Sequence, residues 1–170
     1  WRNSGFHPVR LGLKADASTG LVSILMAKAL SSDAEASLEL WRKRCLQTIN
    51  AVVKAGQRKS HEDTVLALIK SVHNSLVAGY SIWSKNQNWL DLHHLGTYFR
   101  SPDSCVLAVQ SILADVPNNH FELLNDKFIN GLNNKTFIAN YLYSGEKELV
   151  KNIRNQTVSL LNTYVDKLNN

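Results

Sequence analysis

Apolar side chains recur every three or four positions along most of the chain, which is the spacing of one buried face of an α-helix. The clearest segment opens at Ser32, whose hydroxyl would form a capping box with the Glu35 carboxylate. Gly56 ends the pattern, because glycine readily takes the left-handed conformation that closes a helix. We therefore predict a helix over 32–55. Its core stripe consists of Ala34, Leu38, Trp41, Cys45, Ile49 and Val52.

Similar start and stop signals predict further helices towards the C-terminus. A proline in the first turn, as in Ser101-Pro102-Asp103, and a glycine just past the end, as at Gly79, are typical of helix boundaries. The short connection between 55 and 60 favours an antiparallel pair of helices. The expected segments are 60–79, about 88–99, 101–116 and 118–130, followed by a long closing helix from Ser144 to Leu168.

The stretch 127–143 allows two interpretations. It is rich in aromatic and β-branched residues, so 127–130 and 136–143 fit two strands around Gly131-Leu132-Asn133-Asn134. We favour helices, because an isolated hairpin would have no sheet to join and would be only marginally stable.

The first 30 residues carry weaker signals. Residues 1–17 contain Gly5, Pro8 and Gly12 without clear periodicity, and we interpret them as an extended or irregular N-terminal segment or linker. From Ser18 to about Leu30 a dense apolar run predicts a buried helix. The fold class is therefore all-α, with residues 18–170 forming a single compact bundle of about seven or eight helices. Its loops are short, and a long amphipathic helix closes it.

The composition agrees with one folded domain. The 170 residues, 44% of them hydrophobic, are sufficient for a core of their own. The longest apolar run, 21–30, is about half as long as a membrane-spanning helix needs to be. Because the first residue is Trp1 rather than Met, we expect a fragment of a larger protein. Cys45 and Cys105 fall within helical stripes, so we expect two buried, reduced thiols, which favours an intracellular setting.

No residue pattern points to catalysis, a metal ion or a cofactor. The glycines are scattered singly, which disfavours a phosphate-binding loop. His93 and His94 are adjacent, and neighbours on a helix point about 100° apart, so the pair would not grip one metal ion. We expect no catalytic residue, no metal and no cofactor. A hydrolase or transferase with its site near His93 and His94 is the least favoured alternative.

Positive charge is concentrated in the first half of the chain. The net charge is +5, and residues 1–85 hold 12 Lys and Arg against 6 Asp and Glu. A basic set surrounds the helix that carries Trp41 and its exit: Arg42, Lys43, Arg44, Lys54, Arg58 and Lys59. Such a set fits phosphates or acidic lipid headgroups, so a module that binds nucleic acid or anionic membrane lipid is one alternative function. However, three consecutive cations fan around a helix, which favours an ordinary solvated face.

Two tryptophans supply the leading functional hypothesis. Trp83 and Trp89 flank the polar segment 84–88, where a loop would expose at least one of them. Exposed aromatic side chains often anchor protein interfaces. We therefore favour a non-enzymatic helical interaction domain that presents a helical surface or the Trp83–Trp89 segment to a partner protein.

Overall fold

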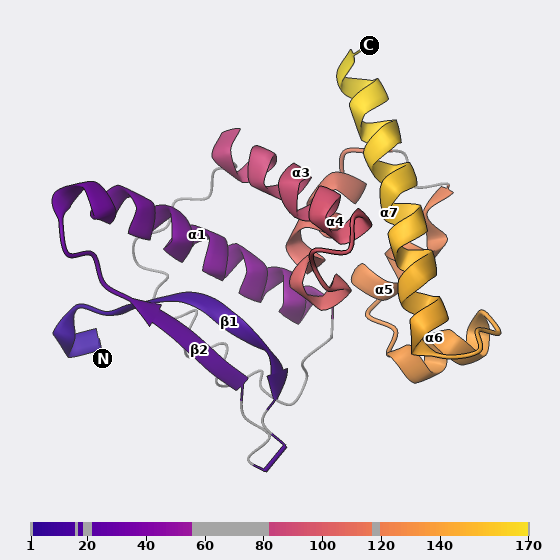
Figure 1. The fold of residues 1–170 in the computed structure, drawn as a ribbon, viewed down its shortest axis with the longest axis horizontal. Coiled ribbons are helices and arrows are strands. Elements are labelled where there is room, and N and C mark those ends of the chain that lie inside the picture. The colour runs from indigo at the N-terminus through magenta and orange to yellow at the C-terminus, as the bar shows by residue number, and fades with distance from the viewer. Residues whose placement is uncertain (1, 16, 19–21, 56–81, 117–119, 170) are drawn as a thin grey trace. The chain divides into compact units, whose positions relative to one another are not determined.

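The computed structural model describes residues 2–15, 17–18, 22–55, 82–116 and 120–169, and most of them are helical (Figure 1). Among these residues, those before Ala51 belong to one compact unit and those from Ala51 onward belong to another. The chain is thus divided, where the sequence predicted one bundle. No described helix is both long and apolar enough to cross a membrane. The helix expected over 60–79 lies outside the described residues.

An antiparallel pair of strands begins the first unit, after a 3₁₀ turn at Arg2–Ser4. Strand β1 (His7–Ala15) pairs with β2 (Val22–Ala27), and Leu11 lies opposite Ile24. The expected helix over 18–30 is therefore wrong, and the extended form expected within 1–17 is a paired strand. The apolar run 22–27 fits a strand as well as a helix, and its pairing with β1 decides between them.

Gly12 lies inside β1, although isolated glycines in this stretch suggested irregular backbone. A Cβ added at Gly12 would lie 2.9 Å from the backbone oxygen of Ser23 on the facing strand. The glycine therefore allows the two strands to approach closely.

Helix α1 (Ser32–Lys54) follows the hairpin and confirms the helix predicted over 32–55. Its cap differs from the expected capping box, because the backbone N–H of Ala34 donates to Ser31 Oγ at 3.3 Å. Leu38, Cys45 and Ile49 are buried as expected, whereas Trp41 is 52% exposed. The predicted core stripe is therefore confirmed at Leu38, Cys45 and Ile49 and wrong at Trp41.

From Ile82 onward, the described residues of the second unit form five helices and a 3₁₀ turn: α3 (Ile82–Gly96), the 3₁₀ turn (Pro102–Ser104), α4 (Val106–Leu113), α5 (Glu122–Phe128), α6 (Asn134–Asn140) and α7 (Glu146–Asn169). These helices pack around α4 and α7. Helix α4 is buried along most of its length, and α7 contacts α3, α4, α5 and α6. The core of the unit is formed by residues of all these helices, with Leu92, Val109, Phe128, Phe137 and Leu160 fully buried.

Helices, not strands, occupy the stretch 127–143. Helix α6 begins where the Asn133 side chain accepts from the Thr136 N–H at 3.0 Å, so the favoured interpretation is confirmed. The closing helix is also confirmed as α7, which Ser144 precedes as expected. Leu168, the last residue of the predicted helix, is exposed.

Candidate interaction surface

The basic set predicted from the sequence is only partly described. Arg42 and Lys43 both face the Glu39 carboxylate, at 2.9 Å and 3.8 Å, so one acid offsets part of their charge. Arg44 and Lys54 belong to the same helix α1. Arg58 and Lys59 lie outside the described residues.

The Trp83–Trp89 segment is helical, which corrects the loop expected there. Helix α3 starts at Ile82 rather than near residue 88, so both tryptophans belong to it. Six residues on a helix turn about 600°, which is about 120° short of two full turns, so the two positions do not share one face. The Trp89 side chain is 40% exposed, and its ring stacks on His93 with 5.4 Å between centroids.

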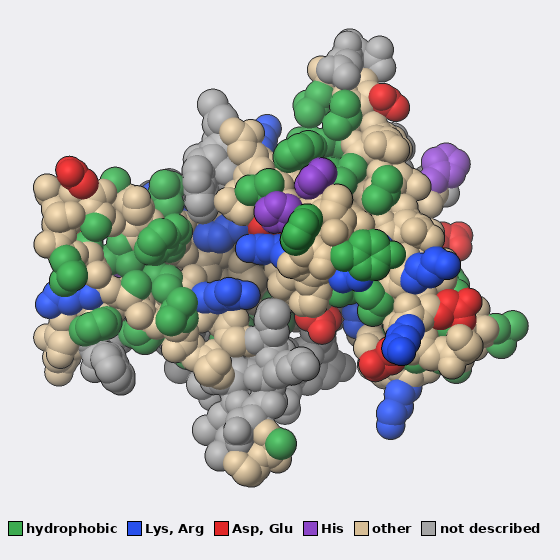
Figure 2. Space-filling model, in the orientation of Figure 1, with side chains coloured by type: hydrophobic (Ala, Val, Ile, Leu, Met, Phe, Trp, Pro, Cys, Tyr) green, Lys and Arg blue, Asp and Glu red, His purple; other side chains and the backbone are tan. Residues whose placement is uncertain are grey.

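A row of rings continues from Trp89 past the end of α3. His93 lies 6.0 Å from His94, and His94 meets the edge of Phe99 at 5.8 Å between centroids. Phe99 is 80% exposed and Tyr98 63%. We call these five side chains, Trp89, His93, His94, Tyr98 and Phe99, the aromatic surface. Figure 2 shows hydrophobic and His side chains gathered over α3 and the segment after it.

Backbone geometry fixes Tyr98 and Phe99 at the end of α3. Tyr98 has a left-handed φ of 71°, and its N–H donates to the Leu95 oxygen while the Phe99 N–H donates to the His94 oxygen at 2.9 Å. This pattern is a Schellman motif, in which glycine is the usual left-handed residue. A left-handed backbone costs a non-glycine residue about 1–2 kcal/mol. The chain therefore keeps an exposed tyrosine where a glycine would be less strained.

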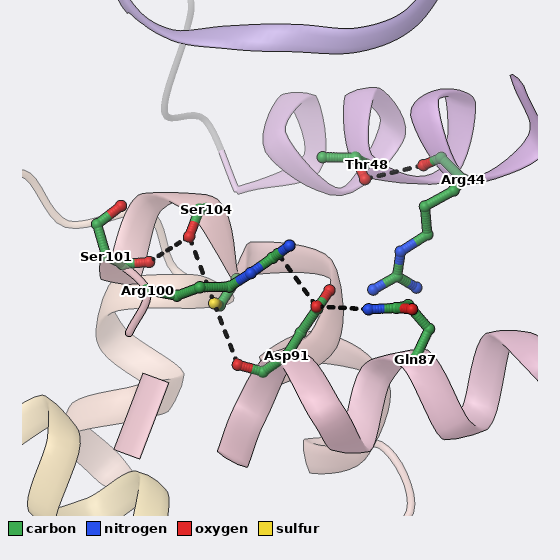
Figure 3. Close-up of polar contacts among 8 residues, drawn as sticks. Arg44, Thr48, Gln87, Asp91, Arg100, Ser101 and Ser104 are labelled. Carbon is green, nitrogen blue, oxygen red and sulfur yellow. Dashed lines mark hydrogen bonds and ion pairs between the residues drawn. The ribbon is translucent and has the colours of Figure 1, made fainter. Parts of the chain in front are cut away.

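An ion pair between the buried Asp91 carboxylate and the partly exposed Arg100 guanidinium holds the segment that follows (Figure 3). The Asp91 Oδ1 accepts from Gln87 Nε2 at 2.8 Å and from Arg100 Nη1 at 3.0 Å, and the Asp91 carboxylate is buried. The Cys105 thiol donates to the Asp91 backbone oxygen at 3.4 Å. Removal of Arg100 would leave the buried carboxylate without its cation, and a buried polar group that loses its partner costs about 1–3 kcal/mol. These contacts anchor the chain directly after Phe99.

Arg154 of α7 supports the same segment from the other side. Its Nη2 donates to the Arg100 backbone oxygen at 3.0 Å, and its guanidinium carbon lies 4.1 Å from the centre of the Tyr98 ring. A cation over an exposed ring contributes about 0.5–1 kcal/mol. The aromatic surface is therefore held by contacts from α3, α4 and α7.

Tyr98 and Phe99 were missed as site residues by the sequence interpretation. They were assigned to the end of a helix expected over 88–99, whereas α3 ends at Gly96. The sequence signal for the helix end was weak, because glycine, the usual left-handed residue, stands at position 96 and not at position 98, which is the left-handed one. The contact that marks the site, Arg154 over Tyr98, joins residues 56 positions apart.

The nucleophile and metal candidates have no reactive arrangement among the described residues. Cys45 and Cys105 are free and buried, and burial raises the pKa of the Cys45 thiol to about 11 and that of Cys105 above its ordinary value. A raised pKa keeps a thiol protonated and unreactive. No group of three or more His, Cys, Asp or Glu side chains in the described part of the chain could hold a metal ion.

Comparison with known proteins gives no family for this chain. Neither a family model nor a curated protein matches it. Any function must therefore be argued from the geometry described above.

Proposed function

We propose that this chain is a non-enzymatic helical domain that binds a partner protein through the aromatic surface. The observation that carries the proposal is Tyr98, an exposed aromatic residue in a left-handed conformation at the end of α3. Strained backbone persists where the surrounding structure enforces it, and such positions cluster at functional sites. A rigid, exposed aromatic side chain is also the residue type that dominates protein interfaces.

Pre-organisation supports this assignment. The contacts of Arg100 and Arg154 hold Tyr98 and Phe99 in place before any partner binds, so little conformational entropy would be lost on association. Trp89, Leu90, Tyr98 and Phe99 are all exposed large apolar residues within eleven positions of one another. A gathering of this kind is more typical of an interface than scattered single side chains are.

The alternatives have weaker support. In the basic set, Glu39 offsets the charge of Arg42 and Lys43, which reduces the attraction for phosphate or acidic lipid. A hydrolase or transferase at His93 and His94 would need a nucleophile or a metal beside them. Instead His93 stacks on Trp89 and His94 forms an edge contact with Phe99, so both rings belong to the aromatic surface.

Site-specific cross-linking tests the proposal. The full chain would carry p-benzoylphenylalanine in place of Phe99 in the cells that make it, with the same group at exposed Ser37 as the matched control. We expect a discrete cross-linked protein from position 99 that is absent from position 37. The purified partner would then be titrated calorimetrically with Trp89→Ala, Phe99→Ala and Trp83→Ala variants whose circular dichroism is unchanged.

The expected result is that Trp89→Ala and Phe99→Ala each weaken binding about tenfold or more, as for interface anchors, while Trp83→Ala has a smaller effect. Equal cross-linking from positions 99 and 37 would contradict the proposal. Unchanged affinity in both the Trp89→Ala and Phe99→Ala variants would also do so.

A further inference from the structure

Three cations of α7 extend the aromatic surface. Lys147, Lys151 and Arg154 stand at positions i, i+4 and i+7, so they share one face of the helix. We call them the α7 basic stripe. Arg154 ends the stripe over the Tyr98 ring, and the next residue on this face, Val158, packs against Gly96 at the end of α3. The stripe therefore leads directly to Tyr98.

No ion pair within 4.0 Å holds the two lysines of the stripe among the described residues. Lys147 and Lys151 are exposed, and neither forms an ion pair with any described residue. Glu146 and Glu148 flank the stripe about 100° around the helix on either side. Glu146 accepts from Asn134 at 3.1 Å and Glu148 accepts from Ser144 at 2.7 Å, and the charge of Lys151 contributes to lowering the pKa of the Glu148 carboxyl.

The aromatic surface adds no negative charge of its own. None of its members carries a carboxylate, and the nearby Asp91 carboxylate is buried and paired with Arg100. An apolar area beside a row of unpaired ammonium groups is complementary to a segment that combines an apolar side chain with carboxylates.

The geometry points to the chemistry of the partner, an inference that rests on the proposed function. We infer that the aromatic surface and the α7 basic stripe together bind an acidic peptide segment of the partner protein. An apolar side chain of the segment packs on Tyr98 and Phe99, and its carboxylates pair with Lys151 and Lys147. The stripe is about 10 Å long at 1.5 Å per residue. An extended segment covers that length in about three residues.

A peptide fits the charge distribution better than nucleic acid does. Residues 82–169 carry eight Lys and Arg and eight Asp and Glu, so this part of the chain has no net charge. Binding to a phosphate backbone depends on many cations and is typical of strongly basic domains. A short acidic segment needs only the few cations that the stripe supplies.

Selection from a displayed library of random peptides, each about 12 residues long, tests this inference on the full chain. The recovered peptides would be synthesised and titrated against the wild type and a Lys147→Glu, Lys151→Glu double variant. The control carries Arg10→Glu and Lys28→Glu, which change the net charge equally on exposed residues of the first unit. A Phe99→Ala variant and a single-stranded oligonucleotide complete the set.

We expect recovered peptides enriched in Asp and Glu within about four residues of a Leu, Phe or Trp. The double reversal on α7 should weaken their binding about tenfold, as two exposed charge pairs would, while the control changes it little. Raising the salt from about 20 mM to about 500 mM should weaken wild-type binding, and less so that of the α7 variant.

Several outcomes would overturn the inference. Peptides that need Phe99 but carry no acidic preference, or that bind the α7 variant normally, would refute the acidic segment and leave the proposed function standing. Peptides that are indifferent to Phe99→Ala would count against both. Tighter binding of the oligonucleotide, lost in the α7 variant, would assign the surface to nucleic acid. Failure to enrich any peptide would also reject it.

Discussion

Replacing Tyr98 with glycine should leave the fold about as stable as the wild type, whereas replacing it with alanine should destabilise it. Glycine removes a left-handed strain of about 1–2 kcal/mol. It loses about 0.5–1 kcal/mol through the greater freedom of the unfolded chain. It also loses the contact of the ring with Arg154, about 0.5–1 kcal/mol. These contributions nearly cancel, because the ring is 63% exposed and little burial is lost.

Alanine at the same position keeps the strained backbone and loses the contact with Arg154. The Tyr98→Gly variant should therefore be more stable than Tyr98→Ala by about 0.5–1 kcal/mol. This is the reverse of the order inside a helix, where alanine is more stable than glycine by about 1 kcal/mol. Exposed Asn155, inside α7, supplies the control pair Asn155→Gly and Asn155→Ala with the ordinary order.

Urea unfolding followed by circular dichroism measures the difference. With a slope of about 1–3 kcal/mol per molar urea, the two Tyr98 variants should differ in midpoint by about 0.4 M. Leu142, which has a φ of 54° and is 91% exposed at the end of α6, should show the same reversed order. If Tyr98→Ala is the more stable variant while the Asn155 pair shows the ordinary order, the left-handed backbone at position 98 is not strained, and the reasoning is refuted.

Three further predictions concern ionisable groups. Hydrogen bonds from Ser144 hold the pKa of Glu148 below its ordinary 4.5, so the stability that the Glu148 carboxylate contributes is complete above pH 4.5 and is lost as the pH falls below that value. Glu148→Gln should therefore flatten the acid side of the plot of stability against pH, and an unchanged plot would contradict this. Burial, which raises the pKa of Cys45 to about 11, should keep Cys45 and Cys105 unreactive towards dithiobis-nitrobenzoate near about pH 8 until urea unfolds the chain; rapid native labelling would contradict it. Burial and a hydrogen bond to the Asp126 carboxylate raise the pKa of Tyr141 from 10.0 to about 12, so the stability due to the neutral phenol should decline between those pH values. Tyr141→Phe should remove an ultraviolet titration step near pH 12, and loss of a step near pH 10 instead would refute the raised pKa.

The helices that were predicted well are those with local signals. The helix over 32–55 and the closing helix are specified by apolar stripes within one segment, so no distant residue is needed to recognise them. The strand at Val22–Ala27 was missed because its apolar run has no decisive period, and the pairing with His7–Ala15 depends on residues distant in sequence. Strand formation is decided by such partners more than by local preference.

The candidate site was predictable only in part for the same reason. Trp89 was identified from its polar surroundings, and it is exposed on α3. Tyr98 and Phe99 were not, because their placement follows from the left-handed turn just after α3 ends at Gly96 and from Arg154, which lies on another helix. The α7 basic stripe could not be recognised as a run of positive charge, because Glu146 precedes Lys147 and Glu148 stands between the two lysines. Its members come together only through the turn of the helix.

The last turn of α1 determines where this protein can be cut. Ala51, Val52 and Ala55 are buried in the core of the second unit. The Ala51 backbone oxygen also accepts from Gln110 Nε2 at 3.0 Å. A fragment that starts at Ile82 would lack these side chains, uncover apolar atoms beneath them and leave Gln110 with one backbone partner, the Phe128 oxygen. Dissection of the second unit therefore has to retain the C-terminal end of α1, even though it is supplied by a helix that starts in the other unit.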